Sequence, residues 1–152
     1  MSSDENPSAQ RRPVRILLVE DNPADIRLTR EMFRESKIRN DLIVAADAEE
    51  AERMLGLAGG EATEARPDLM LLDLNLPGKD GHELLEEVKS HPDLRRIPVV
   101  VLTSSEAEED IVKSYDHHAN AFVTKPVGLD GLSSIVAAID EFWFEVVRLT
   151  DD

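Results

Sequence analysis

The chain has 152 residues, no cysteine, and 32 acidic against 17 basic side chains, which leaves a net charge of −15. This length suits one domain that buries its core without disulfides, and so negative a field repels the phosphates of nucleic acids. The polar first thirteen residues lack the apolar core of a secretion signal, and apolar runs such as 16–19 are far shorter than the roughly 20 residues of a membrane-spanning helix. We therefore expect a cytoplasmic protein that neither binds nucleic acid directly nor enters a membrane.

The predicted elements alternate between strand and helix after a polar leader. Residues 1–13 carry no apolar period, which predicts disorder. The run 14–19 is apolar and β-branched enough for a buried strand, and Pro23 is well placed to begin a helix. A second strand at 42–44 precedes Asp47 and Glu50, whose spacing is that of a helix N-cap and its reciprocal partner. We expect that helix to end near Gly59-Gly60.

The second half of the chain continues the same alternation. The runs 69–72 and 99–102 are continuously apolar, as in strands that are covered on both faces of a parallel sheet. Helical spacing of apolar residues predicts a helix at 82–91, and Ser105 can cap another that continues to His118. Residues 121–123 are the fifth and last predicted strand. Regular alternation predicts an α/β fold with a doubly wound parallel sheet and helices on both faces.

The last predicted helix, about residues 129–149, has an apolar stripe that faces the sheet, and Phe144 lies outside this stripe. Its position predicts a contact with another subunit or a partner, including a homodimer through this helix. The alternative is an isolated exposed aromatic at the end of a helix. We expect residues 14–149 to form the domain and 150–152 a short tail.

Four of the predicted strands end in residues that suit phosphate chemistry. These residues are Glu20 and Asp21, Asp73, Thr103, and Lys125. Because the carboxyl ends of parallel strands meet at one edge of a sheet, the side chains should share a pocket. Three carboxylates without nearby histidine or cysteine suit Mg²⁺, or Mn²⁺, rather than Zn²⁺. The pattern indicates a metal ion and a phosphoryl group.

Asp73 is the best candidate for a nucleophile that forms an aspartyl phosphate. The cation, the ammonium of Lys125 and the hydroxyl of Thr103 could neutralise the phosphoryl oxygens. The turn-forming residues after Asp73 can bring a backbone carbonyl near the metal, and Asn75 is our choice for that carbonyl. Taken singly, each residue also has a plain structural reading, such as acids that favour a helix N-terminus.

The motifs that carry these residues resemble the receiver domain of two-component response regulators. They are the stretches 16–23 and 71–78, Asp80-Gly81, Thr103-Ser104 and Lys125-Pro126, and the similarity extends over residues 14–149. The resemblance implies a flavodoxin-like fold with five parallel strands in the order 2-1-3-4-5.

The resemblance also implies a role for each residue. Asp73 would accept a phosphoryl group from the phosphohistidine of a sensor kinase, and Lys125 would pair with a phosphoryl oxygen. Thr103 and Phe122 would form the switch that reshapes the surface after phosphorylation. The metal ligands would be the side chains of Glu20, Asp21 and Asp73 and the backbone carbonyl of Asn75. Glu20 replaces a frequent aspartate and Phe122 a frequent tyrosine, which leaves phosphoryl lifetime and switch amplitude open.

The chain is expected to be a stand-alone receiver, because only three residues follow position 149. It would then act as a switch of protein contacts rather than a turnover enzyme, with an unknown downstream protein. It looks most like the small regulators that accompany phytochrome-type and other hybrid sensor kinases. A phosphate shuttle or sink in a phosphorelay is an alternative, as is a phosphorylation-independent scaffold, against which Asp73 and Lys125 argue. The sequence contains no GxxxxGK[ST] motif, which argues against a nucleotide-binding protein. A haloacid-dehalogenase-type phosphatase would need an acidic residue two positions after Asp73, where this chain has Asn75.

Overall fold

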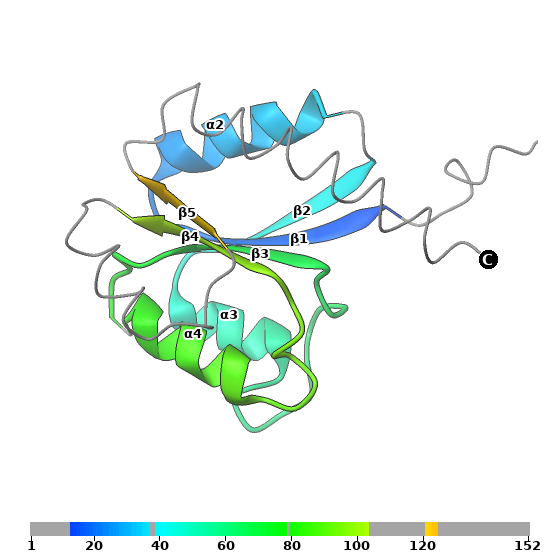
Figure 1. Cartoon of the computed structure of the whole chain (residues 1–152), viewed down its shortest axis with the longest axis vertical. Coiled ribbons are helices and arrows are strands. Elements are labelled where there is room, and N and C mark those ends of the chain that lie inside the picture. The colour runs from blue at the N-terminus through cyan, green and yellow to red at the C-terminus, as the bar shows by residue number, and fades with distance from the viewer. Residues whose placement is uncertain (1–12, 37–38, 79, 104–120, 125–152) are drawn as a thin grey trace, which may run out of the picture.

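A five-stranded parallel sheet forms the centre of the computed structural model, which describes residues 13–36, 39–78, 80–103 and 121–124 (Figure 1). The strand order is β2-β1-β3-β4-β5, so the flavodoxin-like topology implied by the resemblance is confirmed. The strands are β1 (Val14–Val19), β2 (Asn40–Ala45), β3 (Leu69–Asp73), β4 (Val99–Thr103) and β5 (Ala121–Thr124).

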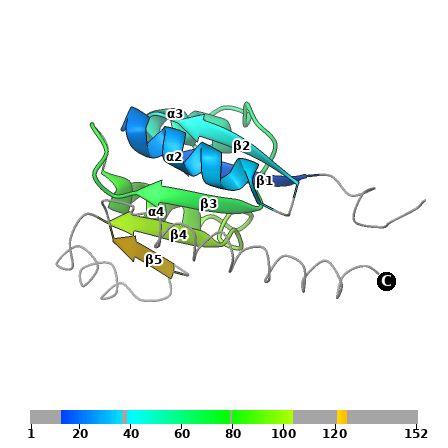
Figure 2. The same cartoon turned by 90° about the horizontal axis from the view of Figure 1, so that it is seen from above.

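Helices cover both faces of this sheet, as expected from the alternation of elements. Helix α2 (Pro23–Arg34) lies on one face, and α3 (Ala48–Leu55) and α4 (Gly81–Ser90) lie on the other (Figures 1 and 2). None of the helices among the described residues is both long and apolar enough to span a membrane. The helices predicted at 105–118 and 129–149 lie outside the described residues.

Helix α2 begins where the sequence predicted it, at Pro23. The side chain of the preceding Asn22 accepts hydrogen bonds from the backbone N–H groups of Ala24 and Asp25, which satisfies donors that the first turn leaves unpaired. This cap places the start of α2 directly after the carboxyl end of β1.

The predicted start of α3 is confirmed, but the predicted end near Gly59-Gly60 was wrong. Asp47 Oδ1 accepts the N–H of Glu50 at 2.7 Å, and Glu50 Oε1 in turn accepts the N–H of Ala46 at 2.8 Å. The helix ends at Leu55, because Gly56 adopts a left-handed conformation with φ of 82°. A glycine in this conformation closes a helix, so the chain turns about one helical turn earlier than expected.

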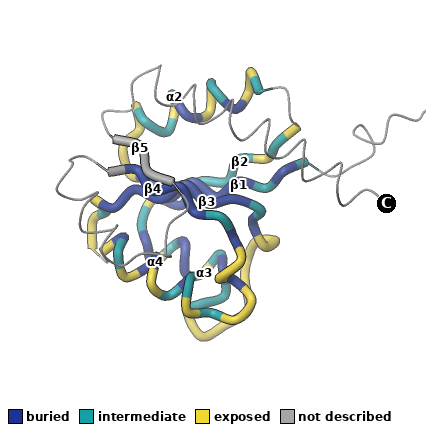
Figure 3. The backbone as a smooth tube through the Cα atoms, viewed as in Figure 1, coloured by how far each residue is buried: buried dark blue, intermediate teal, exposed yellow. Residues whose placement is uncertain are grey.

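Two apolar clusters hold the layers together, one on each face of the sheet. Buried residues follow the central strands of the sheet (Figure 3). Successive residues of β1 alternate between them: Leu17 belongs to the cluster under α3 and α4, whereas Ile16 and Leu18 belong to the cluster under α2. All five residues of β3 are buried. This strand is therefore the fixed centre from which Asp73 projects at the carboxyl edge.

Candidate functional site

The carboxyl edge of the sheet brings together three acidic residues, Glu20, Asp21 and Asp73. One carboxylate oxygen from each lies within 4.8 Å of the others. The strand register explains why these residues lie together. Val19 of β1 pairs with Leu72 of β3, and the acidic residues directly follow these two positions. The convergence that the sequence predicted for these three side chains is therefore present in the structure.

Two of these acids are almost completely buried. Glu20 has 0% and Asp73 has 1% of its surface exposed, whereas Asp21 is exposed. Glu20 is held at both ends: its N–H donates to the carbonyl of Ala45 at 3.0 Å, and its Oε2 accepts the N–H of Asn22 at 3.1 Å. Buried carboxylates of like charge are costly unless a cation neutralises them.

The segment after β3 is fixed by hydrogen bonds to its neighbours. Asn75 donates its N–H to Asp73 Oδ1 at 2.9 Å, and Leu74 donates to the carbonyl of Leu102 in β4 at 3.2 Å. Gly78 follows with a left-handed φ of 74°. The backbone around Asn75 therefore curls back toward the Asp73 carboxylate.

Sequence reasoning assigned no role to Gly81, yet this glycine packs against the site. A Cβ atom at Gly81 would lie 2.7 Å from the carbonyl oxygen of Asp73 and 2.8 Å from the Cα of Leu74. Both atoms belong to the backbone and cannot swing aside. The available signal was a glycine directly after Asp80, the residue that caps α4.

Two of the remaining predicted site residues, Thr103 and Phe122, lie on the next two strands, β4 and β5. Thr103 ends β4 in register with Thr124 of β5, and Phe122 pairs with Val101. The backbone thus places the end of β4 beside that of β3 and the end of β5 beside that of β4. Lys125, and the side chains of Thr103 and Phe122, lie outside the described residues.

The donor set fits a small divalent cation. Three carboxylates with oxygen atoms within 4.8 Å offer the hard oxygen ligands that Mg²⁺ and Mn²⁺ prefer. Within the part of the chain that the structure describes, this is the one group of three or more metal-ligating side chains found. A buried strand-end aspartate beside such a cation is also suited to attack phosphorus.

A family model and a sequence relative both match this chain over most of its length. The family model of the response regulator receiver domain matches residues 16–137. Response regulator Rcp1 from Synechocystis sp. is 47% identical over 149 residues, which cover 98% of each of the two chains.

Solved structures agree with this similarity. The crystal structure of the Mn²⁺-bound form of response regulator Rcp1 has a TM-score of 0.72 at 47% identity and covers 86% of this chain and 94% of that one. The crystal structure of the phosphorylated cyanobacterial phytochrome response regulator RcpA has a TM-score of 0.75 at 49% identity, with coverage of 89% and 96%. The similarity therefore includes the whole sheet and its carboxyl edge.

Proposed function

The chain belongs to the response regulator receiver family, and from this we propose that Asp73 accepts a phosphoryl group from the phosphohistidine of a sensor kinase. Members of this family are switches in two-component signalling that receive phosphate from histidine kinases, and they are not turnover enzymes. The observation that carries the assignment is the position of Asp73, which is buried at the end of the central strand and beside two further carboxylates.

The transfer follows from the chemistry of a fixed carboxylate. An Asp73 oxygen attacks phosphorus in line, the new O–P bond forms, and the P–N bond to the imidazole breaks, with its electron pair leaving on the kinase histidine. Asn75 donates its N–H to Oδ1 at 2.9 Å, which holds the carboxylate in one orientation. Positioning of this kind supplies much of the catalysis in phosphoryl transfer.

We propose that Glu20, Asp21, Asp73 and the Asn75 carbonyl hold Mg²⁺, or Mn²⁺, at this edge. The oxygen-only donor set supports this, and Rcp1 is described in a Mn²⁺-bound form. When bound, the cation supplies neutralising charge to the phosphoryl oxygens. The carboxylates themselves position the cation beside Asp73.

We further propose that Lys125 pairs with a phosphoryl oxygen and that Thr103 and Phe122 transmit the change in charge. The support is that Thr103 ends β4, which pairs with β3, and that β5, which contains Phe122 and directly precedes Lys125 in the sequence, pairs with β4. Phosphorylation would then bias a two-state surface formed by these neighbouring strands.

We also propose the domain bounds, the cellular location, the class of partner kinase and the oligomeric state. We propose a receiver over residues 14–149 that acts in the cytoplasm, receives its phosphoryl group from a phytochrome-type or hybrid kinase, and forms a homodimer through its last helix. RcpA, described as a phytochrome response regulator and 49% identical, supports the kinase class. The aromatic Phe144, outside the apolar stripe of residues 129–149, supports the dimer.

Intact-protein mass spectrometry tests the acceptor. Acetyl phosphate with Mg²⁺ should add one phosphoryl group to the wild type and none to Asp73→Asn, because an amide is not a nucleophile toward phosphorus. The matched control is Asp41→Asn, which removes an exposed acid from β2 and should label normally. Undiminished labelling of Asp73→Asn would contradict the assignment. Phosphotransfer from a panel of purified kinases then tests the phytochrome-type donor.

A further inference from the structure

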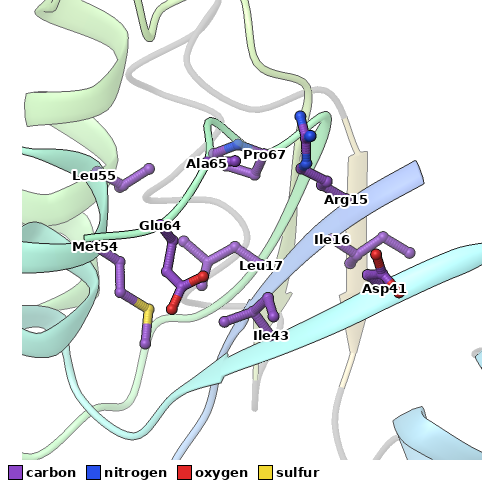
Figure 4. Close-up of a pocket in the computed structure, with 10 residues that line it drawn as sticks. All are labelled: Arg15, Ile16, Leu17, Asp41, Ile43, Met54, Leu55, Glu64, Ala65 and Pro67. Carbon is purple, nitrogen blue, oxygen red and sulfur yellow. The ribbon is translucent and has the colours of Figure 1, made fainter. Parts of the chain in front are cut away.

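A pocket lies at the amino edge of β1 and β2, at the opposite end of the strands from the acidic cluster. It has a volume of about 140 Å³, and Arg15 and Leu17 of β1 help to line it (Figure 4). Arg15 and Glu20 are five positions apart, which at about 3.3 Å per strand residue places the two sites roughly 16 Å apart. The pocket is therefore separate from the proposed phosphorylation site.

The inner wall of this pocket is apolar. Leu17 and Ile43 are register partners in β1 and β2, so their side chains stand together on the face that α3 covers. Met54 of α3 completes this wall, and both Ile43 and Met54 are only partly buried. A short hydrocarbon chain would cover the remaining apolar surface of Ile43 and Met54.

The outer wall carries the carboxylate of an exposed residue, Glu64. In the segment from α3 to β3, Thr63 donates its N–H to the carbonyl of Arg53 at 3.2 Å, and Glu64 donates to that of Met54 at 3.4 Å. These bonds tie the segment to the end of α3. The carboxylate of Glu64 points toward Met54 and Ile43 (Figure 4).

The charges around the pocket favour a cation. Asp41 and Glu64 contribute two negative charges, and Arg15, the register partner of Asp41, contributes one positive charge, which leaves Glu64 as the carboxylate away from the arginine. Among the residues that the structure describes, neither carboxylate forms an ion pair with Arg15. The net charge of −15 over the whole chain also attracts cations and repels anions.

We propose that this pocket binds an aliphatic monocation, an ammonium or guanidinium group on a short hydrocarbon stem. The stem lies on Leu17, Ile43 and Met54, and the charged head lies at the carboxylate of Glu64. A free aliphatic amine and a basic side chain of a protein partner share this chemistry.

NMR titration of the ¹⁵N-labelled full chain tests the proposal with n-butylammonium as the probe. We expect saturable shifts at the amides of Leu17, Ile43 and Met54, and binding of 1-butanol and butyrate weaker by roughly tenfold. Equal binding of the alcohol or of butyrate would overturn the proposal. So would butylammonium shifts confined to Asp21 and Asp73, which report the other site.

Two variants distinguish binding in the pocket from nonspecific attraction of the cation to the acidic surface. Glu64→Gln should weaken butylammonium binding about threefold, as expected for one solvent-exposed charge pair. Glu61→Gln removes an exposed acid from the same segment outside the pocket lining and should leave binding unchanged. Equal effects of the two variants would contradict the assignment.

A last comparison distinguishes the two sources of the cation. Nα-acetyl-lysine methylamide presents the same ammonium and stem next to peptide bonds. Tighter binding of this probe than of butylammonium assigns the pocket to a protein side chain. Equal or weaker binding assigns it to a free amine, and binding of neither probe refutes the proposal.

Discussion

At the scale of single residues, Asn22 connects the acidic cluster to the first helix. Its side chain caps α2 through the N–H groups of Ala24 and Asp25, while its own N–H holds Glu20 Oε2 at 3.1 Å. One carboxylate oxygen of Glu20 is thereby engaged by the backbone. The longer glutamate is thus held in one position although it has an additional methylene group compared with aspartate.

Gly81→Ala should destabilise the protein by about 1–3 kcal/mol, because the new Cβ would overlap backbone atoms of Asp73 and Leu74. The shift needed to relieve this contact would also displace the Asn75 carbonyl and weaken Mg²⁺ binding. Urea unfolding measures the first effect and metal titration the second.

Gly60→Ala is the matched control for this change. A Cβ at Gly60 would have no neighbour within 4 Å. The free energy of unfolding and the Mg²⁺ affinity should therefore stay near the wild-type values. If Gly81→Ala behaved like Gly60→Ala, the contact would not position the site.

At the scale of elements, two side chains brace the connection from α4 to β4. Lys89 Nζ donates to the carbonyls of Arg95 at 3.1 Å and Ile97 at 2.6 Å. His91 Nδ1 accepts the N–H groups of Asp93 at 3.1 Å and Leu94 at 3.3 Å. This turn leads directly into β4, so its order helps to fix the central sheet.

Lys89 should make stability depend on pH, because partial burial lowers the pKa of its ammonium below the ordinary value of 10.5. In the window between the lowered pKa and 10.5, the unfolded chain binds more protons than the folded one, so stability rises with pH. Relative to Lys89→Met, the wild type should become more stable as the pH approaches 10.5 from below. Urea unfolding at several pH values measures this difference, and a pH-independent difference would contradict it.

At the scale of the whole molecule, a net charge of −15 makes the metal-free protein repel itself, most strongly where Glu20, Asp21 and Asp73 meet. Asp21→Asn should therefore stabilise the metal-free protein by about 0.5 kcal/mol. Saturating Mg²⁺, at about 100 times its dissociation constant, should stabilise the wild type by about 2.7 kcal/mol and this variant by much less. Thermal unfolding with and without the metal measures both effects.

The control for this prediction is Asp41→Asn, which removes the same charge at the other edge of the sheet. Since it leaves the acidic cluster intact, it should retain the full response to Mg²⁺. A response that fell equally in both variants would show that total charge, and not the cluster, governs metal binding.

The order and kind of the described elements, and the residues that end their strands, could be predicted from the sequence. Those features depend on local signals: continuous apolar runs such as 69–72 specify strands buried on both faces, and Pro23 and Asp47 mark helix starts. The place of Asp73 at a carboxyl edge followed from the parallel order of the strands.

Tertiary structure alone decided what depends on contacts between distant segments. The sequence has several glycines after Leu55, and the helix ended directly before the first of them, Gly56, with the N–H groups of residues 63 and 64 bonding to carbonyls of its last turn. The 4.8 Å grouping of the carboxylates, the contact of Gly81 with Asp73, and the pocket between β1, β2 and α3 likewise depend on atoms far apart in the chain. No local pattern encodes such distances, because the packing of the whole core sets them.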